Sequence, residues 1–262
     1  MLQLMMVFLI ATVGTPALMM AVMLTSNPLK TLKLRGCHFK WIAFAVVMPF
    51  LIRPLLTELL SRLQWFFPPL PAGMDRVMES MSSDHLPLWL PLLAFAVTPA
   101  ICEELAFRGF ILSGLQRTQR YRLAAVMSSI AFGIVHLIPQ QVFYTTLLGL
   151  VLAALALRSG SLIPGVIFHL IFNATQVLLS RFLKVTENIE WLKRSGILRT
   201  DASGEDPHFA WGLLVGCAVL AAPMLWYLVH GPVAKGWRDA PATDEANNAE
   251  LESRLPAEPT TV

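Results

Sequence analysis

The stretch LAAVMSSIAFGIVHLIPQQVFYTTLLGLVLAALAL, residues 123–157, contains no Asp, Glu, Lys or Arg. One membrane crossing needs about 20 mainly apolar residues, so these 35 residues are too many for a single crossing helix. The segment Ile138-Pro139-Gln140-Gln141 interrupts the run, and proline disrupts a helix interior. We therefore predict two short membrane helices here, at 123–138 and 142–157.

Other stretches without charged residues lie on both sides of this one, at 1–29, 86–102, 159–180 and 207–234. These stretches and the mainly apolar segment 41–60 predict helices near 2–24, 41–60, 87–116, 162–182 and 209–229. The predicted fold class is therefore all-α, a polytopic transmembrane bundle of about seven helices. The composition agrees, with 55% hydrophobic residues, 14% charged residues and a mean hydropathy of +0.60. A soluble domain carries about 25% charge, so this composition excludes a soluble globular enzyme.

The C-terminal tail, residues 231–262, differs from the rest of the chain. It is rich in Ala, Pro, Asn, Thr and Glu and lacks apolar periodicity, so we predict a disordered acidic extension. The chain outside the tail is basic, but no Arg/Lys stripe with interleaved aromatic residues indicates nucleic-acid binding. The predicted organisation is N-terminal helices at 1–86, a core at 87–182, a loop and last helix at 183–230, and the tail at 231–262.

Loop charges predict the orientation in the membrane, because cytoplasmic loops carry an excess of Lys and Arg. The basic loops 25–40 and 117–122 are expected to face the cytoplasm, with the N-terminus outside. The loop 183–208 is also basic, yet seven helices place it outside. We therefore treat the orientation of that loop as open.

Ionisable and polar residues inside the spans are the candidate functional groups, because such residues are costly in a bilayer and mark functional sites. Glu104 and Arg108 have i,i+4 spacing, which favours an ion pair on one helix face. That pairing leaves Glu103 directed elsewhere and suited to act as a general base. The residues that stand out are Glu103, Glu104, Arg108, His136, His169 and Asn173.

Helix geometry predicts that these groups lie at one depth. Glu103 and His136 each lie 14 residues from the loop 117–122, which is about 21 Å along a helix. His169 and Asn173 share one helix face and reach a similar depth from the same side. A single buried His or Asn often serves only to join helices, and a Glu–Arg pair can be purely structural. An unpaired Glu103 level with two histidines, however, favours a catalytic site.

Three motifs carry a family resemblance: Glu103-Glu104…Arg108 (EExxxR), Phe132…His136 (FxxxH) and His169…Asn173 (HxxxN). With these motifs in this order, residues 87–182 resemble the CPBP family of intramembrane proteases. That family includes the type II CAAX prenyl endopeptidases and the bacteriocin-processing, Abi-like self-immunity proteins.

The resemblance implies a helix bundle around a polar cavity, and an endopeptidase that cleaves near the C-terminus of a membrane-bound protein or peptide. Whether that substrate carries a lipid is left open. It implies that Glu103 and His136 activate water, that His169 and Asn173 hold the oxyanion, and that Glu104 and Arg108 support the site. It further implies partners within the lipid bilayer, no nucleic acid, and no metal or other cofactor.

Three other functions remain open from the residues alone. A zinc protease could use Glu103, His136 and His169 as a His₂Glu ligand set with an open water position, although the HExxH spacing is absent. A transporter or proton relay could use the same intramembrane charges, but no inverted repeat is evident. A non-catalytic immunity or binding protein could keep the site without turnover.

Overall fold

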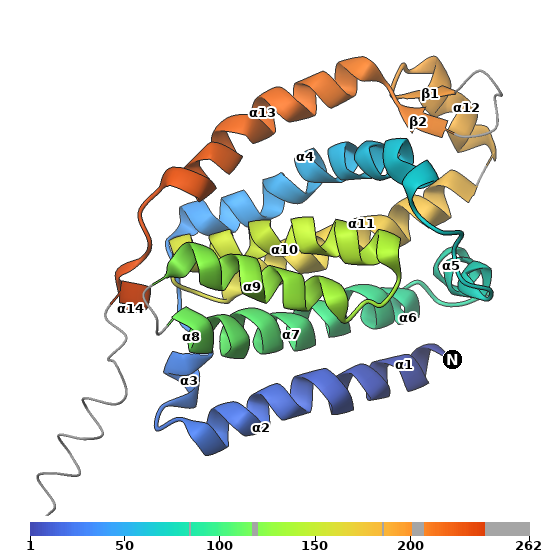
Figure 1. Ribbon diagram of the computed structural model, residues 1–262. Helices are drawn as coiled ribbons and strands as arrows, with labels where there is room; N and C mark the ends of the chain where they lie inside the picture. The colour runs from blue at the N-terminus through green and yellow to red at the C-terminus, as the bar shows by residue number, and fades with distance from the viewer. Residues whose placement is uncertain (84, 117–119, 185, 201–206, 239–262) are drawn as a thin grey trace, which may run out of the picture.

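The computed structural model describes residues 1–262 except 84, 117–119, 185, 201–206 and 239–262 (Figure 1). The predicted helical membrane bundle is confirmed. Six helices in the described chain are long and apolar enough to cross a membrane, and the remaining predicted helix is a shorter apolar one, Tyr121–Ile134. The six long helices are Leu2–Leu24, Phe39–Phe66, Trp89–Leu115, Pro139–Ser159, Ile163–Leu183 and Trp211–His230.

Several of these spans are built from consecutive helical segments, three of which are π-helical. The first span comprises α1 (Leu2–Leu9), η1 (Ile10–Gly14) and α2 (Thr15–Leu24), and the second comprises α4 (Phe39–Leu63) and η2 (Gln64–Phe66). The third comprises α6 (Trp89–Leu92), η3 (Leu93–Val97), α7 (Thr98–Glu104), η4 (Leu105–Ile111) and α8 (Leu112–Leu115). The other helices are α3 (Pro28–Thr31), α5 (Met74–Ser82), α9 (Tyr121–Ile134), α10 (Pro139–Ser159), α11 (Ile163–Lys184), α12 (Thr186–Arg194), α13 (Trp211–His230) and α14 (Lys235–Arg238).

The hairpin of α9 and α10 is packed closely through two glycines. A Cβ on Gly133 would lie 2.0 Å from Thr146 Oγ1, and one on Gly149 would lie 3.1 Å from Ser129. The predicted helix 123–138 is shorter than expected, because α9 ends at Ile134. Pro139 begins α10 and holds the preceding residue in an extended conformation, so the chain turns between the two helices.

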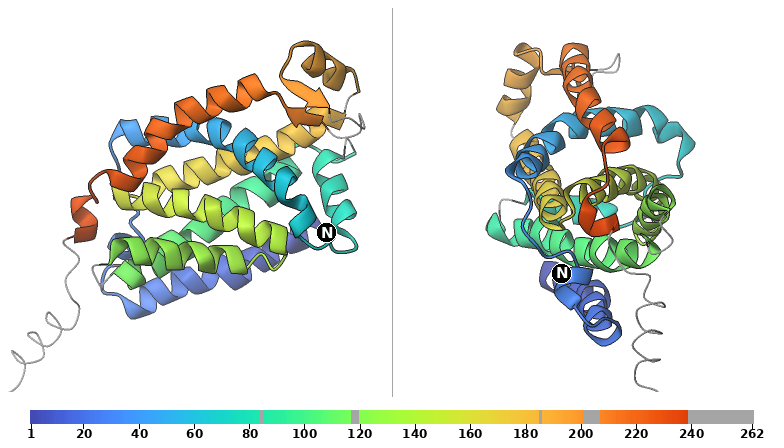
Figure 2. Two further views of the ribbon diagram at one scale, coloured as in Figure 1. Left: turned by 45° about the horizontal axis from the view of Figure 1, so that its top comes forward. Right: turned by 90° about the vertical axis from the view of Figure 1, so that its left-hand side faces the viewer.

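The largest hydrophobic core lies where α4, α10, α11 and α13 meet. It includes the buried side chains of Trp41, Met48, Leu152, Phe168 and Phe172. Two views show α13 lying along one side of the bundle, with the first span on the opposite side (Figures 1 and 2). The first span approaches α7 closely, since a Cβ on Gly14 would lie 2.8 Å from Cys102 Sγ.

The segment 183–208, predicted as a loop, contains regular structure. After α12 it forms strand β1 (Leu198–Thr200), which pairs antiparallel with β2 (Pro207–Phe209). Strands of three residues give too short an alternation to be recognised from sequence. The buried carboxylate of Glu58 on α4 fixes this hairpin, accepting a bond from Arg199 and lying 3.4 Å from His208 Nδ1.

The basic loop 25–40 and the described bases Arg120 and Arg122 lie at the same end of the bundle (Figure 1). Ser113 Oγ donates to Thr31 O at 2.7 Å, and Arg35 Nε donates to Gly160 O at 2.6 Å. The β1–β2 hairpin lies at the opposite end (Figure 1). The two basic segments therefore share one end of the bundle, as the loop charges predict. The assignment of that end to the cytoplasm stays a prediction.

The first residues of the predicted disordered tail are instead structured. Residues 235–238 form α14, and Trp237 is 1% exposed against α10. Its indole Nε1 donates to Ala156 O at 2.9 Å, and Lys33 Nζ lies 4.4 Å from its ring centroid. A single buried aromatic residue such as Trp237 creates no periodic pattern, so the sequence of this polar segment does not predict its burial. The acidic stretch 239–262 lies outside the described residues.

Candidate active site

The two adjacent acids lie at the end of α7, immediately before the π-helical turn η4. The ion pair indicated by their spacing is present, with Arg108 Nη1 at 2.7 Å from Glu104 Oε1 and both side chains fully buried. Arg108 also donates from Nη2 to Gly149 O at 3.2 Å, and its guanidinium lies 4.3 Å from the Phe132 ring centroid. A π-turn often marks a functional position in a helix. The pair ties α7 and η4 to the α9–α10 hairpin.

A glycine allows α11 to approach this ion pair. A Cβ on Gly165 would lie only 2.9 Å from Glu104 Oε2. Oε2 is buried and has no hydrogen-bond partner among the described residues, so the glycine packs directly against it. Any larger residue would separate α11 from the carboxylate.

His169 lies one turn beyond Gly165 on α11 and contacts both acids. Its Nδ1 is 3.2 Å from Glu104 Oε1, and its Nε2 is 3.8 Å from Glu103 Oε2. The ring is 2% exposed and meets Phe132 edge-on, with ring centroids 5.8 Å apart. Because Glu104 is already held by Arg108, its carboxylate accepts from Nδ1 and directs Nε2 toward Glu103.

His136 reaches the site from the turn between α9 and α10. Its Nδ1 lies 2.9 Å from Phe132 O, and a carbonyl oxygen can only accept, so Nδ1 carries the proton. This leaves Nε2 with its lone pair in the neutral ring. The ring centroid lies 5.2 Å from that of Phe132, the same ring that His169 meets edge-on. His136 is half-buried, as is Glu103.

Asn173 lies one turn beyond His169 on the same face of α11 and is half-buried. Its amide makes no side-chain hydrogen bond to any residue that the structure describes. The structure thus brings together Glu103, Glu104, Arg108, His136 and His169, while Asn173 joins them by its position on α11 rather than by a contact.

Sequence reasoning missed the residues that fix the site's internal geometry. Phe132 was noted only as a motif letter, yet its ring contacts both histidines and the Arg108 guanidinium. Gly165, four residues before His169, is the sequence feature that could have indicated the close approach of α11 to Glu104. The direct contact between His169 and Glu104 had no signal, because periodicity does not say which helices adjoin.

Metal binding needs several ligands at about 2.0–2.3 Å from one point. Within the described residues, no three His, Cys, Asp or Glu side chains form a group that could hold a metal ion. The alternative zinc ligands are Glu103, His136 and His169. Nδ1 of His136 is hydrogen-bonded to a backbone carbonyl oxygen, and Nδ1 of His169 faces Glu104. Each histidine would therefore have to use Nε2.

A helical membrane bundle that brings two carboxylates and two histidines together between its spans, one of each fully enclosed, defines a candidate intramembrane hydrolase. Residues 85–175 match the family described as type II CAAX prenyl endopeptidase Rce1-like, and this segment contains all three motifs. The match supports the predicted resemblance of this segment to CPBP intramembrane proteases. In comparisons with curated proteins and with solved structures, nothing matches this chain.

Family and fold together define the general nature of the molecule. It is a multi-pass integral membrane protein, with six candidate spans and a protease family's core segment. The family is embedded in the lipid bilayer and acts on membrane-associated substrates.

Proposed function

We propose that this protein is an intramembrane endopeptidase that hydrolyses a peptide bond near the C-terminus of a membrane-associated substrate, in CAAX-type processing or a related reaction. The different surroundings of two neighbouring acids support it most directly. Glu104 is fully buried and bound to Arg108, whereas Glu103 is half-buried and faces His169, whose ring packs on the same phenylalanine, Phe132, as that of His136. One acid is structural, and the other is available for chemistry.

Water activation is assigned to Glu103 and His136. The Glu103 carboxylate accepts a proton from a water molecule between the two side chains, and the unprotonated Nε2 of His136 accepts the water's second hydrogen bond. Because His136 Nδ1 is held by Phe132 O, its acceptor nitrogen keeps a fixed direction. The water oxygen then attacks the scissile carbonyl carbon.

Oxyanion stabilisation is assigned to His169 and Asn173. The Asn173 amide donates to the oxygen that becomes negative. His169 donates from Nε2 as an imidazolium, with the Glu104 carboxylate at Nδ1 balancing its charge. Collapse of the tetrahedral intermediate breaks the C–N bond, and the proton taken up by Glu103 passes to the departing amine.

The direct test is cleavage of a defined peptide by the full-length protein in lipid vesicles. The substrate is a synthetic peptide ending in a prenylated cysteine followed by three residues, and the products are identified by mass spectrometry. We expect cleavage after the cysteine by the wild-type protein and none by Glu103→Gln. Glu79→Gln, an exposed acid on α5, is the matched control and should retain full activity.

Three results would overturn the proposal. Equal activity of Glu103→Gln and wild type would remove Glu103 as the base. An intact peptide with the wild-type protein, together with ion flux across the same vesicles, would favour a transporter. Binding of the peptide without cleavage would favour a non-catalytic immunity or binding protein.

A further inference from the structure

Arg53 is a second buried cation in the membrane-spanning part of the chain, and neutral groups surround it. It is 6% exposed on α4. Its Nε donates to Thr175 Oγ1 at 2.7 Å, its Nη1 donates to Gln176 Oε1 at 2.5 Å, and its Nη2 donates to Phe172 O. Among the described residues, no carboxylate lies within ion-pair distance of this guanidinium.

Arg53 differs from Arg108 in having no carboxylate counter-ion among the described residues. Both guanidiniums are buried and lie over a phenylalanine ring, at 4.3 Å for Arg108 and 4.1 Å for Arg53. Arg108 has the carboxylate of Glu104, so its charge is balanced within the protein. A buried charge without a counter-ion is costly in a membrane protein and marks a functional position. The natural complement of a guanidinium is a carboxylate, which it binds with two parallel hydrogen bonds.

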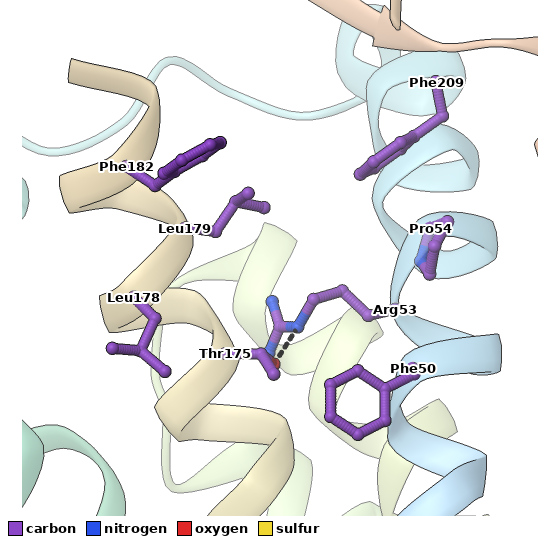
Figure 3. A pocket seen from close by; sticks show the side chains of 8 residues that line it. All are labelled: Phe50, Arg53, Pro54, Thr175, Leu178, Leu179, Phe182 and Phe209. Carbon is purple, nitrogen blue, oxygen red and sulfur yellow. Dashed lines mark hydrogen bonds between the residues drawn. The ribbon is translucent and has the colours of Figure 1, made fainter. Parts of the chain in front are cut away.

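Arg53 also lines an apolar pocket between α4 and α11, with a volume of about 510 Å³. In Figure 3 the guanidinium reaches from α4 toward Thr175 on α11, and apolar side chains surround the space beside it. These side chains are Phe50, Pro54, Leu178, Leu179, Phe182 and Phe209. A ligand that fills this pocket and reaches Arg53 combines an apolar group with an anionic one.

Gln176 links this cation to the candidate active site. It lies seven residues after His169 and three after Asn173, so all three share one face of α11. Gln176 is exposed, while its Oε1 accepts from Arg53. Along the helix, Thr175 and Gln176 lie about 9–10 Å from His169. Three extended residues span about 10 Å, so a three-residue tail beyond the scissile bond would bring its end to Arg53.

We propose that Arg53 binds the C-terminal carboxylate of the substrate and that the apolar pocket takes the last side chain. The inference rests on the proposed endopeptidase function. In this arrangement Arg53 determines specificity because it binds only a terminal carboxylate that lies at a fixed distance from the scissile bond. The C-a-a-X sequence has three residues after its cysteine, which fits this distance. The pocket selects a large apolar residue at the final position.

The first test compares two peptides that differ only at their end, a free carboxylate and a carboxamide. Hydrogen bonds to charged groups contribute enough to give the wild-type protein at least a tenfold higher kcat/KM for the free acid, mainly through KM. Arg53→Gln should remove this preference, and Arg53→Lys should restore part of it. Arg62→Gln, an exposed position on the same helix, is the control and should keep the preference.

A purely structural role for Arg53 would lower the cleavage of both peptides equally and leave their ratio unchanged. Gln176→Glu tests the same point without removing the arginine, because the new carboxylate supplies an internal counter-ion. We expect Gln176→Glu to lose the preference for the free acid. Retention of the full preference by Arg53→Gln or by Gln176→Glu would overturn the assignment.

A second test needs no variant, only wild-type protein and peptides with one to five residues after the cysteine. Three residues should give the highest kcat/KM, with lower values on both sides. Equal cleavage of all lengths, or of acid and amide, would remove the role of Arg53 while leaving the endopeptidase function intact. Failure of the wild-type protein to cleave any peptide would instead contradict the proposed function itself.

Discussion

His169 and Glu104 are joined through Nδ1 and Oε1 at 3.2 Å in the interior of the bundle. The same oxygen of Glu104 lies 2.7 Å from Arg108 Nη1, so one carboxylate both balances the arginine and orients the imidazole. The other ring nitrogen of His169 faces Glu103 at 3.8 Å. The ion pair and the candidate catalytic groups therefore form one connected network, and substitutions in it should have separable effects.

The two neighbouring acids should respond differently to the same isosteric change. Glu103→Gln removes the proton acceptor and should abolish turnover, with a melting temperature close to that of the wild type. Glu104→Gln leaves Arg108 without its counter-ion and weakens the orientation of His169, so it should lower both turnover and melting temperature. Thermal unfolding and kcat are measured in one detergent. A larger loss of melting temperature in Glu103→Gln would reverse the two roles.

Removing Arg108 should destabilise the bundle strongly. Arg108→Ala removes the arginine counter-ion of the fully buried Glu104 carboxylate, and breaking such a buried pair typically costs about 3–5 kcal/mol of unfolding free energy. Arg62→Ala breaks a pair whose arginine is 53% exposed and should cost no more than about 1 kcal/mol.

The double variant Arg108→Met/Glu104→Gln identifies the cause, because it removes both charges. It should be more stable than Arg108→Ala. A double variant that loses the sum of both single effects would show that the pair's charge balance does not matter. All free energies come from equilibrium unfolding under matched conditions.

Gly165 should tolerate no side chain. In Gly165→Ala the new Cβ would lie 2.9 Å from Glu104 Oε2, so α11 must shift away and carry His169 with it. We expect at least a tenfold loss of kcat and a destabilisation of about 1–3 kcal/mol. Gly216→Ala on α13 is the matched control, because its Cβ meets nothing within 4 Å. Equal effects of the two variants would contradict the close-approach argument.

Much of this architecture follows from the sequence because membrane spans obey simple rules of length and charge. The mainly apolar runs locate the seven predicted helices, and the i,i+4 spacing of Glu104 and Arg108 indicates their ion pair. The position of His136 in a turn is harder to predict from the sequence. Its helix ends early because of Pro139, and the run around it stays apolar throughout.

Features that depend on contacts between distant segments were not predictable. Trp237 lies in a polar tail, and only the fold reveals that α10 supplies a carbonyl for its indole. Arg53 sits in an apolar helix with no motif around it, and its neighbours come from α11. Periodicity identifies which residues share a face of a helix, but it does not identify the neighbouring helix that packs against that face.

Metal dependence can be tested independently of the site residues. If Glu103 and His136 activate water as proposed, exhaustive dialysis against a chelator should leave cleavage unchanged, and elemental analysis should find less than stoichiometric zinc. The His₂Glu alternative with Glu103, His136 and His169 requires the opposite. Chelator-sensitive turnover that is restored by added zinc, with one equivalent bound, would establish that alternative.

Asn173 is expected to act on the transition state rather than on the fold. Its amide is half-buried on the face of His169 and makes no side-chain hydrogen bond within the described part of the chain. A donor aimed at the developing oxyanion contributes about 10²–10³ in turnover. A hydrogen bond between membrane helices averages only about 0.6 kcal/mol. These magnitudes separate a catalytic amide from a structural one.

Asn173→Ala should therefore reduce kcat at least tenfold, while KM and melting temperature change little. Asn173→Asp should retain activity only while its carboxyl is protonated, because an ionised carboxylate repels the oxyanion. Its activity should thus fall as the pH rises through the pKa of the introduced acid, in contrast to the wild type. The measurements are kcat across pH and thermal unfolding of each variant. Near-normal kcat of Asn173→Ala with a lowered melting temperature would show that this amide serves to link helices.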